Sequence, residues 1–212
     1  MKRFRAAIFD WDVTLLDSQH INYLASVHIF ELFGLAPPTE KEYYREISSK
    51  YMPFYWDRGV PRTATKEDLN AIRKDFMADH WAAAGLFPDV FPVLANFRMA
   101  GFKTAVVSAE DSEILAKRIK LFGIGKLLHH YVGDAFDKKI LIWDVLDMFG
   151  MEPEECFFVD DSPGDIPTIK ESGVYTIGIT RGIRTREAIE AARPDMIVDS
   201  LNEILPLVDA EE

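Results

Sequence analysis

The feature that most constrains the fold is an alternation of short, apolar, strand-like runs with longer amphipathic segments. Five such runs occur along the chain, and we expect each to be followed by a helix: residues 6–9, 103–107, 156–159, 174–177 and 196–198. Strands that alternate with helices form a parallel sheet with crossover helices. The sequence therefore predicts an α/β fold with a Rossmann-like parallel sheet as its core.

Two of the helical segments are well defined by their spacing. Residues 111–122 and 139–149 both carry apolar residues three and four apart, and each segment is followed by a glycine, Gly123 or Gly150. This pattern is typical of amphipathic helices that lay one face on a sheet and end at a glycine.

One stretch, residues 18–84, breaks the alternation. It shows no convincing strand and three helical segments, separated by Pro37-Pro38 and by residues 53–61. We therefore predict an α/β core domain made of residues 1–17 and 85–212, with residues 18–84 inserted as an all-helical cap domain. We expect this cap to close over the core as a hinged lid.

Helix starts within the cap can be placed from capping residues. Thr39 with Glu42 forms a capping box, and Thr65 with Asp68 forms a weaker version of it. We expect Gly85 to end the third helix, before the chain returns to the sheet domain.

The net charge and the composition of the chain limit which partners it can bind. The 212 residues carry 24 Lys and Arg against 35 Asp and Glu, a net charge of −11. Such an excess argues against binding nucleic acid or an anionic membrane through overall charge. The apolar stretch before Asp10 is too short for a signal peptide, and no run approaches the length of a membrane span. We expect a cytoplasmic monomer or small homo-oligomer that holds any anionic ligand locally.

The chain has one cysteine, Cys156, which excludes an internal disulfide. Its five histidines make no metal-ligand spacing, alone or with the cysteine. Disulfide-stabilised and zinc-stabilised folds are therefore excluded, and we expect Cys156 to be a core residue.

Carboxylates gather directly after two of the predicted strands. Asp10 and Asp12 follow the first strand, Asp160 and Asp161 follow the third, and Asp165 lies four residues beyond. Open parallel sheets bind their ligands at the carboxyl ends of the strands. So many carboxylates would repel one another unless a cation lay among them. Oxygen-only ligands at an open site favour Mg²⁺ over zinc.

An Asp-x-Asp pair by itself is a weak signal, because loop and helix-cap carboxylates produce it by chance. The carboxylates after the third strand make a chance origin less plausible, and two further residues do the same. Ser108 follows the second strand, and Lys138 stands at a predicted helix start. They supply a hydroxyl and a positive charge where a phosphate would lie.

In order and spacing these residues resemble the four motifs of the haloacid dehalogenase (HAD) superfamily. The motifs are residues 8–18, residues 105–108, Lys138 and residues 158–165, so the resemblance covers nearly the whole chain. It points to the phosphatase and phosphomutase branch with a helical cap after the first motif. It implies a Mg²⁺-dependent phosphatase that acts on a small phosphorylated metabolite through an aspartyl phosphate.

The resemblance also implies roles for the carboxylates. Asp10 would be the nucleophile, and Asp12 the acid/base that protonates the leaving alcohol and later activates water. Asp161, with the Asp10 carboxylate and the Asp12 main-chain carbonyl, would bind Mg²⁺. Asp160 and Asp165 would support that metal, directly or through its ligands.

Phosphate contacts are implied for Ser108 with the N–H groups of its turn, including Ala109, and for Lys138. Ala109 stands where relatives often have Asn or Gly, so a side-chain contact is missing. No proline follows Lys138, which leaves Lys139 as a second candidate. We favour Lys138, because it begins the apolar stripe of its helix and Lys139 is turned about 100° away. Val13 replaces the usual glycine, and we expect it to have an ordinary negative φ and to stiffen the loop.

The cap is expected to decide the substrate. Its cations at Arg45, Lys50, Arg58 and Arg62 flank the aromatic residues of segment 43–56. The simpler interpretation is a set of solvated helix faces around the cap core. The functional interpretation is an aromatic pocket with one arginine for an anionic substrate tail.

Three alternatives to a phosphatase remain open. A sugar phosphomutase would use the same core residues with a cap cation. A dehalogenase would attack carbon through Asp10, but its relatives lack the acid at Asp12 and the metal aspartates. A catalytically idle binding protein would be expected to have lost a catalytic group, and none is lost here.

Overall fold

The computed structural model describes residues 4–47, 51–135, 137–182 and 184–208. The chain divides into two compact units. One, which we call the α/β unit, combines Met1–Asp17 with Gly85–Glu212, and the other, the helical unit, is Ser18–Ala84. No helix among the described residues is both long and apolar enough to cross a bilayer.

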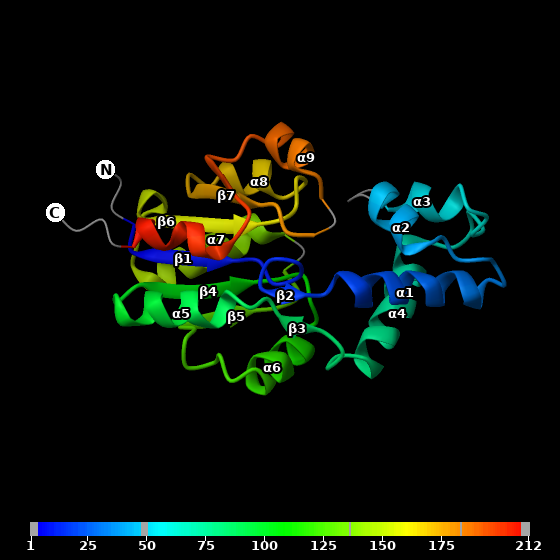
Figure 1. The fold of residues 1–212 in the computed structure, drawn as a ribbon, viewed down its shortest axis with the longest axis horizontal. Coiled ribbons are helices and arrows are strands. Elements are labelled where there is room, and N and C mark those ends of the chain that lie inside the picture. The colour runs from blue at the N-terminus through cyan, green and yellow to red at the C-terminus, as the bar shows by residue number, and fades with distance from the viewer. Residues whose placement is uncertain (1–3, 48–50, 136, 183, 209–212) are drawn as a thin grey trace. The chain divides into compact units, whose positions relative to one another are not determined.

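The α/β unit is built on a six-stranded parallel sheet with strand order β5-β4-β1-β6-β7-β8 (Figure 1). The predicted α/β fold is confirmed. The third segment in chain order, β5, was not predicted, and β7 lies slightly later than expected. The strands are β1 (Ala6–Phe9), β4 (Lys103–Val107), β5 (His130–Val132), β6 (Cys156–Asp160), β7 (Tyr175–Ile179) and β8 (Met196–Val198).

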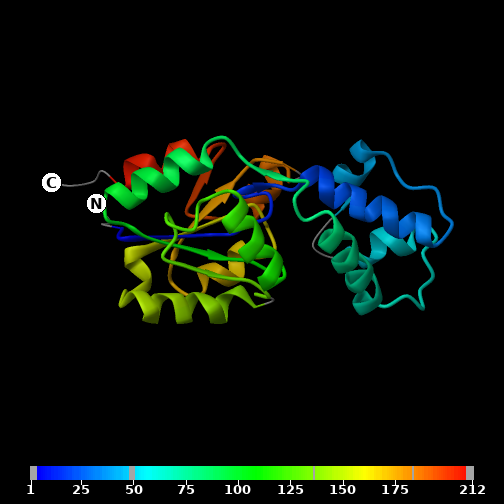
Figure 2. The ribbon, with the colours of Figure 1, turned by 90° about the horizontal axis from the view of Figure 1, so that it is seen from below.

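Helices cover both faces of this sheet. Figure 2 shows α5 and the C-terminal 3-10 helix η2 on one side and α7 on the opposite side. The crossover helices predicted around residues 111–122 and 139–149 are α6 and α7. The helices of the unit are α5 (Val90–Met99), α6 (Ser112–Leu121), α7 (Lys138–Phe149), η1 (Pro153–Glu155), α8 (Ile166–Lys170), α9 (Arg186–Ala191) and η2 (Leu201–Leu207).

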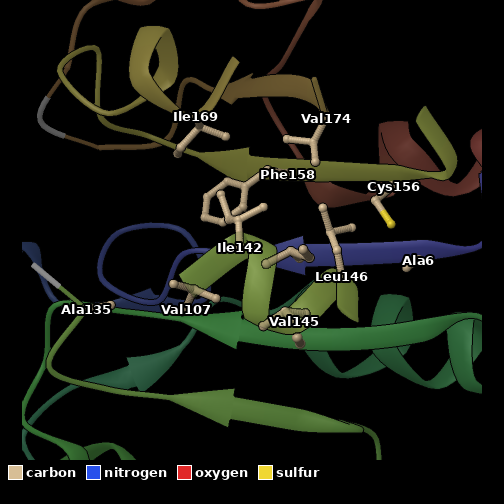
Figure 3. Packing of buried hydrophobic residues seen from close by; sticks show 12 residues of the cluster. Ala6, Val107, Ala135, Ile142, Val145, Leu146, Cys156, Phe158, Ile169 and Val174 are labelled. Atoms are coloured by element: carbon tan, nitrogen blue, oxygen red, sulfur yellow. The ribbon is translucent and has the colours of Figure 1, made fainter. Parts of the chain in front are cut away.

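Alternate residues of the central strands pack into two different layers, as the period of a strand requires. On the α7 side, Ile142 and Leu146 lie in one buried cluster with Phe158 of β6 (Figure 3). On the opposite side, the Phe97 ring of α5 stacks on the Phe9 ring of β1 with centroids 6.1 Å apart. Burying each such side chain stabilises the fold by about 1.5–3 kcal/mol. Cys156 lies in the first layer as a buried free thiol, as expected.

Helix α7 begins at Lys138, one residue before the predicted segment, and ends at Gly150. Gly150 has φ +62°, the left-handed conformation that a helix C-terminus commonly needs and that glycine adopts without a steric cost. Because α7 begins at Lys138, this residue lies in the first turn of the helix.

The described residues of the helical unit form four helices, one more than predicted. Both predicted capping boxes are present, at the starts of α2 and α4, and α1 packs against α4. The unpredicted α3 overlaps residues 53–61, which were expected to separate helices. Pro53 stands in its first turn, where its missing N–H is not needed. The helices are α1 (Gln19–Leu32), α2 (Glu40–Glu46), α3 (Met52–Trp56) and α4 (Lys66–Asp79).

The prediction that Gly85 ends the last of these helices is wrong. Helix α4 already ends at Asp79, where the His80 ring nitrogen Nδ1 lies 2.8 Å from the Phe76 carbonyl oxygen and the backbone turns away. Gly85 instead belongs to β3 (Gly85–Leu86), which pairs antiparallel with β2 (Leu16–Asp17).

The expectation of a negative φ for Val13 is also wrong, since its φ is +60°. The tight turn after β1 imposes this conformation: the N–H groups of Leu15 and Leu16 both donate to the Trp11 carbonyl at 2.9 Å. The Val13 N–H donates to the Leu16 carbonyl at 2.8 Å. A β-branched residue is strained at this φ, whereas glycine is not.

Candidate active site

The order of the strands brings three chain segments to one edge of the sheet. Strand β1 lies between β4 and β6, and Phe9 is in register with Val106 on one side and Val159 on the other. The Asp10 N–H continues this ladder by donating to the Val159 carbonyl at 2.9 Å. Residues that follow these three strands therefore lie at the same carboxyl edge.

Three carboxylates meet at this edge. One carboxylate oxygen from each of Asp10, Asp160 and Asp161 lies within 4.8 Å of the others. Asp10 is 6% exposed and Asp160 only 1% exposed. Asp160 Oδ1 accepts a hydrogen bond of 2.8 Å from the Ser162 N–H, which fixes the orientation of this carboxylate.

Lys138, the first residue of α7, points its ammonium group into these carboxylates. Its Nζ lies 2.8 Å from Asp10 Oδ1, 2.9 Å from Asp160 Oδ2 and 2.8 Å from Asp165 Oδ2. The Lys138 side chain is 10% exposed, whereas that of Asp165 is 43% exposed. Asp165 thus reaches the cluster from its rim and is outside the group of three close carboxylates.

Lys139 points elsewhere. Its Nζ forms an ion pair of 2.7 Å with Glu171 Oε2, and both side chains are substantially exposed. The orientations of the two lysines are those expected from the helical register, with Lys138 inward and Lys139 toward solvent.

The charges of the cluster are not balanced. Burial, together with the nearby Asp160 and Asp12, raises the pKa of Asp10 to about 8 although Lys138 opposes the shift. Burial and the neighbouring carboxylates also raise the pKa of Asp160, and that of Asp161 well above its usual range. Burial alone would lower the pKa of Lys138, but the surrounding carboxylates raise it well above normal. One ammonium group is therefore too little positive charge for this edge.

Ser108 follows β4 at the same edge and is 1% exposed. Its N–H donates to the Val132 carbonyl at 3.0 Å, and its Oγ accepts from the Glu110 N–H at 3.0 Å. The next residue, Ala109, is exposed, and within the described residues its N–H has no hydrogen-bond acceptor. The turn therefore offers an oriented hydroxyl and a free N–H group.

Asp12 lies just past Asp10 and contributes no oxygen to the close group of three. Its Oδ1 is buried and has no hydrogen-bond partner in the part of the chain that the structure describes. A buried carboxylate oxygen without a partner is costly, which is typical of a functional group that awaits its substrate.

The chain matches the model of haloacid dehalogenase-like hydrolases over residues 7–179. It belongs to this family. The phosphoglycolate phosphatase of Vibrio parahaemolyticus is 30% identical over 216 residues, which cover 94% of both chains. That of Salmonella typhimurium is 33% identical over 161 residues, which cover 71% of this chain and 62% of the relative.

A solved structure supports the fold of this HAD-like hydrolase. A haloacid dehalogenase-like hydrolase from Streptococcus pneumoniae matches it with a TM-score of 0.81, at 21% identity, over 97% of this chain and 99% of the other. The predicted family and the prediction of an enzyme of its phosphatase branch are confirmed.

HAD phosphatases generally use a divalent metal, and the site of this HAD-like hydrolase fits one. Its close donors are all carboxylate oxygens, the kind of ligand that hard divalent cations prefer. A dication would also offset the negative charge that Lys138 leaves unbalanced. Of the five predicted metal-site residues, Asp10, Asp160 and Asp161 are brought within ligand distance of one another.

The described cap cations that the sequence suggested as substrate ligands either form ion pairs or are exposed to solvent. Arg45 and Arg58 both form ion pairs with Glu46. Arg62 is exposed, with its guanidinium 5.4 Å from the Trp56 ring centroid. Lys50 lies outside the described residues.

A further arginine of the helical unit, Arg73 of α4, was not among the predicted cap cations. Its Nη2 donates to the buried Asn22 Oδ1 at 2.6 Å, and it has no acidic partner among the described residues. Arg73 is half-buried, and its positive charge partly opposes the burial that raises the pKa of Tyr55. The Tyr55 hydroxyl donates to Ser26 Oγ at 3.1 Å.

Proposed function

We propose that this HAD-like hydrolase cleaves phosphate monoesters of small metabolites, with Asp10 as the nucleophile. The observation that supports this most directly is the Asp10 carboxylate, held 2.8 Å from Lys138 in a buried group with Asp160 and Asp161. A carboxylate fixed beside a cation at a strand end can approach a phosphate dianion that it would otherwise repel.

In the first step an Asp10 carboxylate oxygen attacks phosphorus, and the bond from phosphorus to the alcohol oxygen breaks. Asp12, in its protonated form, gives its proton to the departing oxygen. Ser108 Oγ and the Ala109 N–H hold phosphoryl oxygens, and Lys138 stabilises the negative charge that develops on them. The products are the free alcohol and a phosphoryl group on Asp10.

In the second step a water molecule attacks phosphorus and the bond from phosphorus to Asp10 breaks. Asp12, now a carboxylate, accepts the proton of the water. Inorganic phosphate leaves, and Asp10 and Asp12 return to their starting states. Dividing the reaction in this way replaces one difficult displacement by two easier ones.

We propose Mg²⁺ as the divalent cation, held by the carboxylates of Asp10 and Asp161 and by the main-chain carbonyl of Asp12. Asp160 and Asp165 orient Lys138 and support these ligands. When bound, the cation shields the phosphate from the negative charge of the nucleophile.

We also propose that the helical unit acts as a cap that selects the substrate through Arg73. Among the described residues the half-buried Arg73 guanidinium has no carboxylate partner, and such a group is a suitable receptor for an anionic group. The substrate is then a small phosphate ester with a second anionic group, such as phosphoglycolate, for which the Vibrio and Salmonella relatives are named.

The test is release of inorganic phosphate from a panel of phosphoglycolate, sugar phosphates, nucleotides and an aryl phosphate, each with Mg²⁺ and with a chelator. We expect Mg²⁺-dependent turnover, highest for a small carboxylated ester. Turnover that is unchanged by the chelator would contradict the metal, and transfer of phosphate between sugar hydroxyls without release would favour a phosphomutase. We propose a cytoplasmic monomer or small homo-oligomer, which gel filtration of the purified protein measures.

A further inference from the structure

A charged pair is buried next to the phosphate-binding turn, outside the residues that the mechanism uses. Arg118 of α6 forms an ion pair with Glu110 through its Nη1, and the two side chains are 0% and 5% exposed. Taking two charges out of water is costly, and well-packed apolar residues often stabilise a fold as well as such a pair does. Stability alone is therefore a poor explanation for these two residues.

Glu110 connects the buried pair to Ser108. The Glu110 N–H donates to Ser108 Oγ at 3.0 Å, and the Glu110 carbonyl accepts from the Asp134 N–H at 2.7 Å. Its carboxylate is held by Arg118. Glu110 is thus fixed at three points, and one of them orients the hydroxyl that faces the phosphate.

The turn is held from the other side by residues 133–135. A Cβ placed on Gly133 would lie 2.6 Å from the Glu110 carbonyl oxygen, so only glycine allows this approach. Asp134 Oδ2 accepts from Ser112 Oγ at 2.7 Å, and the Ala135 N–H donates to the Ser108 carbonyl at 2.9 Å. The turn lies between this loop and the start of α6.

Arg118 also places a positive charge beside the Glu110 carboxylate. Burial and the nearby Asp12 carboxylate raise the pKa of Glu110 to about 8, and Arg118 counters both effects. Without Arg118, the buried carboxylate would lose the ion pair that offsets the charge of Asp12.

We propose that Glu110 and Arg118 are positioning residues of the phosphate-binding turn. They hold Ser108 Oγ and the Ala109 N–H in the arrangement that receives phosphoryl oxygens, without themselves touching the substrate. This inference rests on the proposed phosphatase function, because it takes Ser108 as a phosphate ligand.

The test is the double variant Glu110→Gln/Arg118→Met, which removes both charges and keeps the side-chain sizes similar. Calorimetric titration with inorganic phosphate in the presence of Mg²⁺ measures phosphate binding directly and does not depend on catalysis. We expect the Kd of phosphate to rise about tenfold. The KM for an aryl phosphate should rise by a similar factor, while kcat changes by less than about threefold.

A control pair lies in the same unit, away from the sheet edge. Lys170 and Asp195 form an ion pair of 2.7 Å, and the variant Lys170→Met/Asp195→Asn should leave the phosphate Kd unchanged. If the Glu110/Arg118 variant changes only the melting temperature and keeps the wild-type phosphate Kd and KM, the pair is merely structural and the proposal is wrong.

If the double variant does not fold, the single variant Glu110→Gln decides the question. It removes one charge of the buried pair, keeps the side-chain size and leaves the bond from the residue-110 N–H to Ser108 Oγ possible. We expect the Kd of phosphate to rise about fivefold, whereas an unchanged Kd would overturn the proposal. Wild-type protein that binds phosphate but hydrolyses no ester would contradict the proposed function and not the positioning role.

Discussion

The two units place their charges differently. In the α/β unit, Asp10, Asp160 and Arg118 are buried, and the Lys138 side chain is only 10% exposed. In the helical unit, the described ion pairs lie at the surface: the side chains of Arg45 and Glu46 are 64% and 35% exposed. The buried polar groups of the helical unit are neutral instead, such as Asn22 and Ser26.

The difference follows from the cost of burying charge. An exposed pair gains about 0–1 kcal/mol and can be lost without consequence, whereas a buried charge must be paired or it destabilises the fold. The same low-dielectric surroundings strengthen any interaction with a reacting group. We infer that the α/β unit performs the charge chemistry and that the helical unit contributes selection.

The largest effect should come from Asp10→Asn. The change keeps the size of the side chain and removes the nucleophile, so we expect turnover to fall by more than about 10³-fold. Phosphate release by purified protein measures it, and a thermal melt close to wild type shows that the fold is intact. Retention of more than a few per cent of activity would exclude an aspartyl phosphate.

Lys138 and Lys139 form a matched pair, one buried in the cluster and one at the surface. Lys138→Ala should lower kcat/KM for phosphate esters by about 10²–10³-fold, because the charge on the phosphoryl oxygens loses its stabilisation. Lys139→Ala should stay near wild type, because it breaks only an exposed pair with Glu171. The reverse pattern would transfer the phosphate-binding role to Lys139.

Asp12→Asn tests the proton transfer. We expect turnover of alkyl phosphates to fall by about 10²–10⁴-fold. The loss in the first step should shrink for an aryl phosphate, whose leaving group needs no proton, and burst kinetics can follow that step alone. Equal losses for both kinds of substrate would mean that Asp12 acts mainly on the metal or on the second step.

Selection by the helical unit predicts a smaller and more specific effect. Arg73→Met should lower kcat/KM for phosphoglycolate by about 10-fold to 100-fold, the loss of one charged hydrogen bond, and leave an aryl phosphate unaffected. Arg62→Met, in the same unit but exposed, is the control. Equal losses for both substrates would assign Arg73 a structural role.

The sheet core could be predicted because its signals are local. The apolar runs of β1, β4 and β6 end in polar residues, and parallel strands bring those ends together. Strand β5 could not be predicted, since His130-Tyr131-Val132 is an edge strand with partly exposed side chains and no apolar pattern. The sequence does not predict helix α3, because Pro53 is typical of a break between helices, although proline is also favoured in a first turn.

The site was predictable to the same extent. The spacing of its motifs identifies the strand-end carboxylates and places Lys138 on the inner side of its helix. The pair of Glu110 with Arg118 carries no such signal, because an arginine on an amphipathic helix is normally solvated. Only the three-dimensional structure shows that Arg118 is buried and which carboxylate it meets.

Val13 gives the smallest predicted effect, and it concerns the turn that follows the nucleophile. Its φ of +60° depends on the bonds of Leu15 and Leu16 to the Trp11 carbonyl, which no local pattern reports. Val13→Gly relieves a strain of about 1–3 kcal/mol but loses a buried side chain. Val198→Gly in β8 loses a buried side chain and relieves no such strain. The free energy of unfolding should therefore fall by about 1–3 kcal/mol less for Val13→Gly than for Val198→Gly, as urea denaturation measures. Equal losses at the two positions would show that the left-handed turn is not strained by valine.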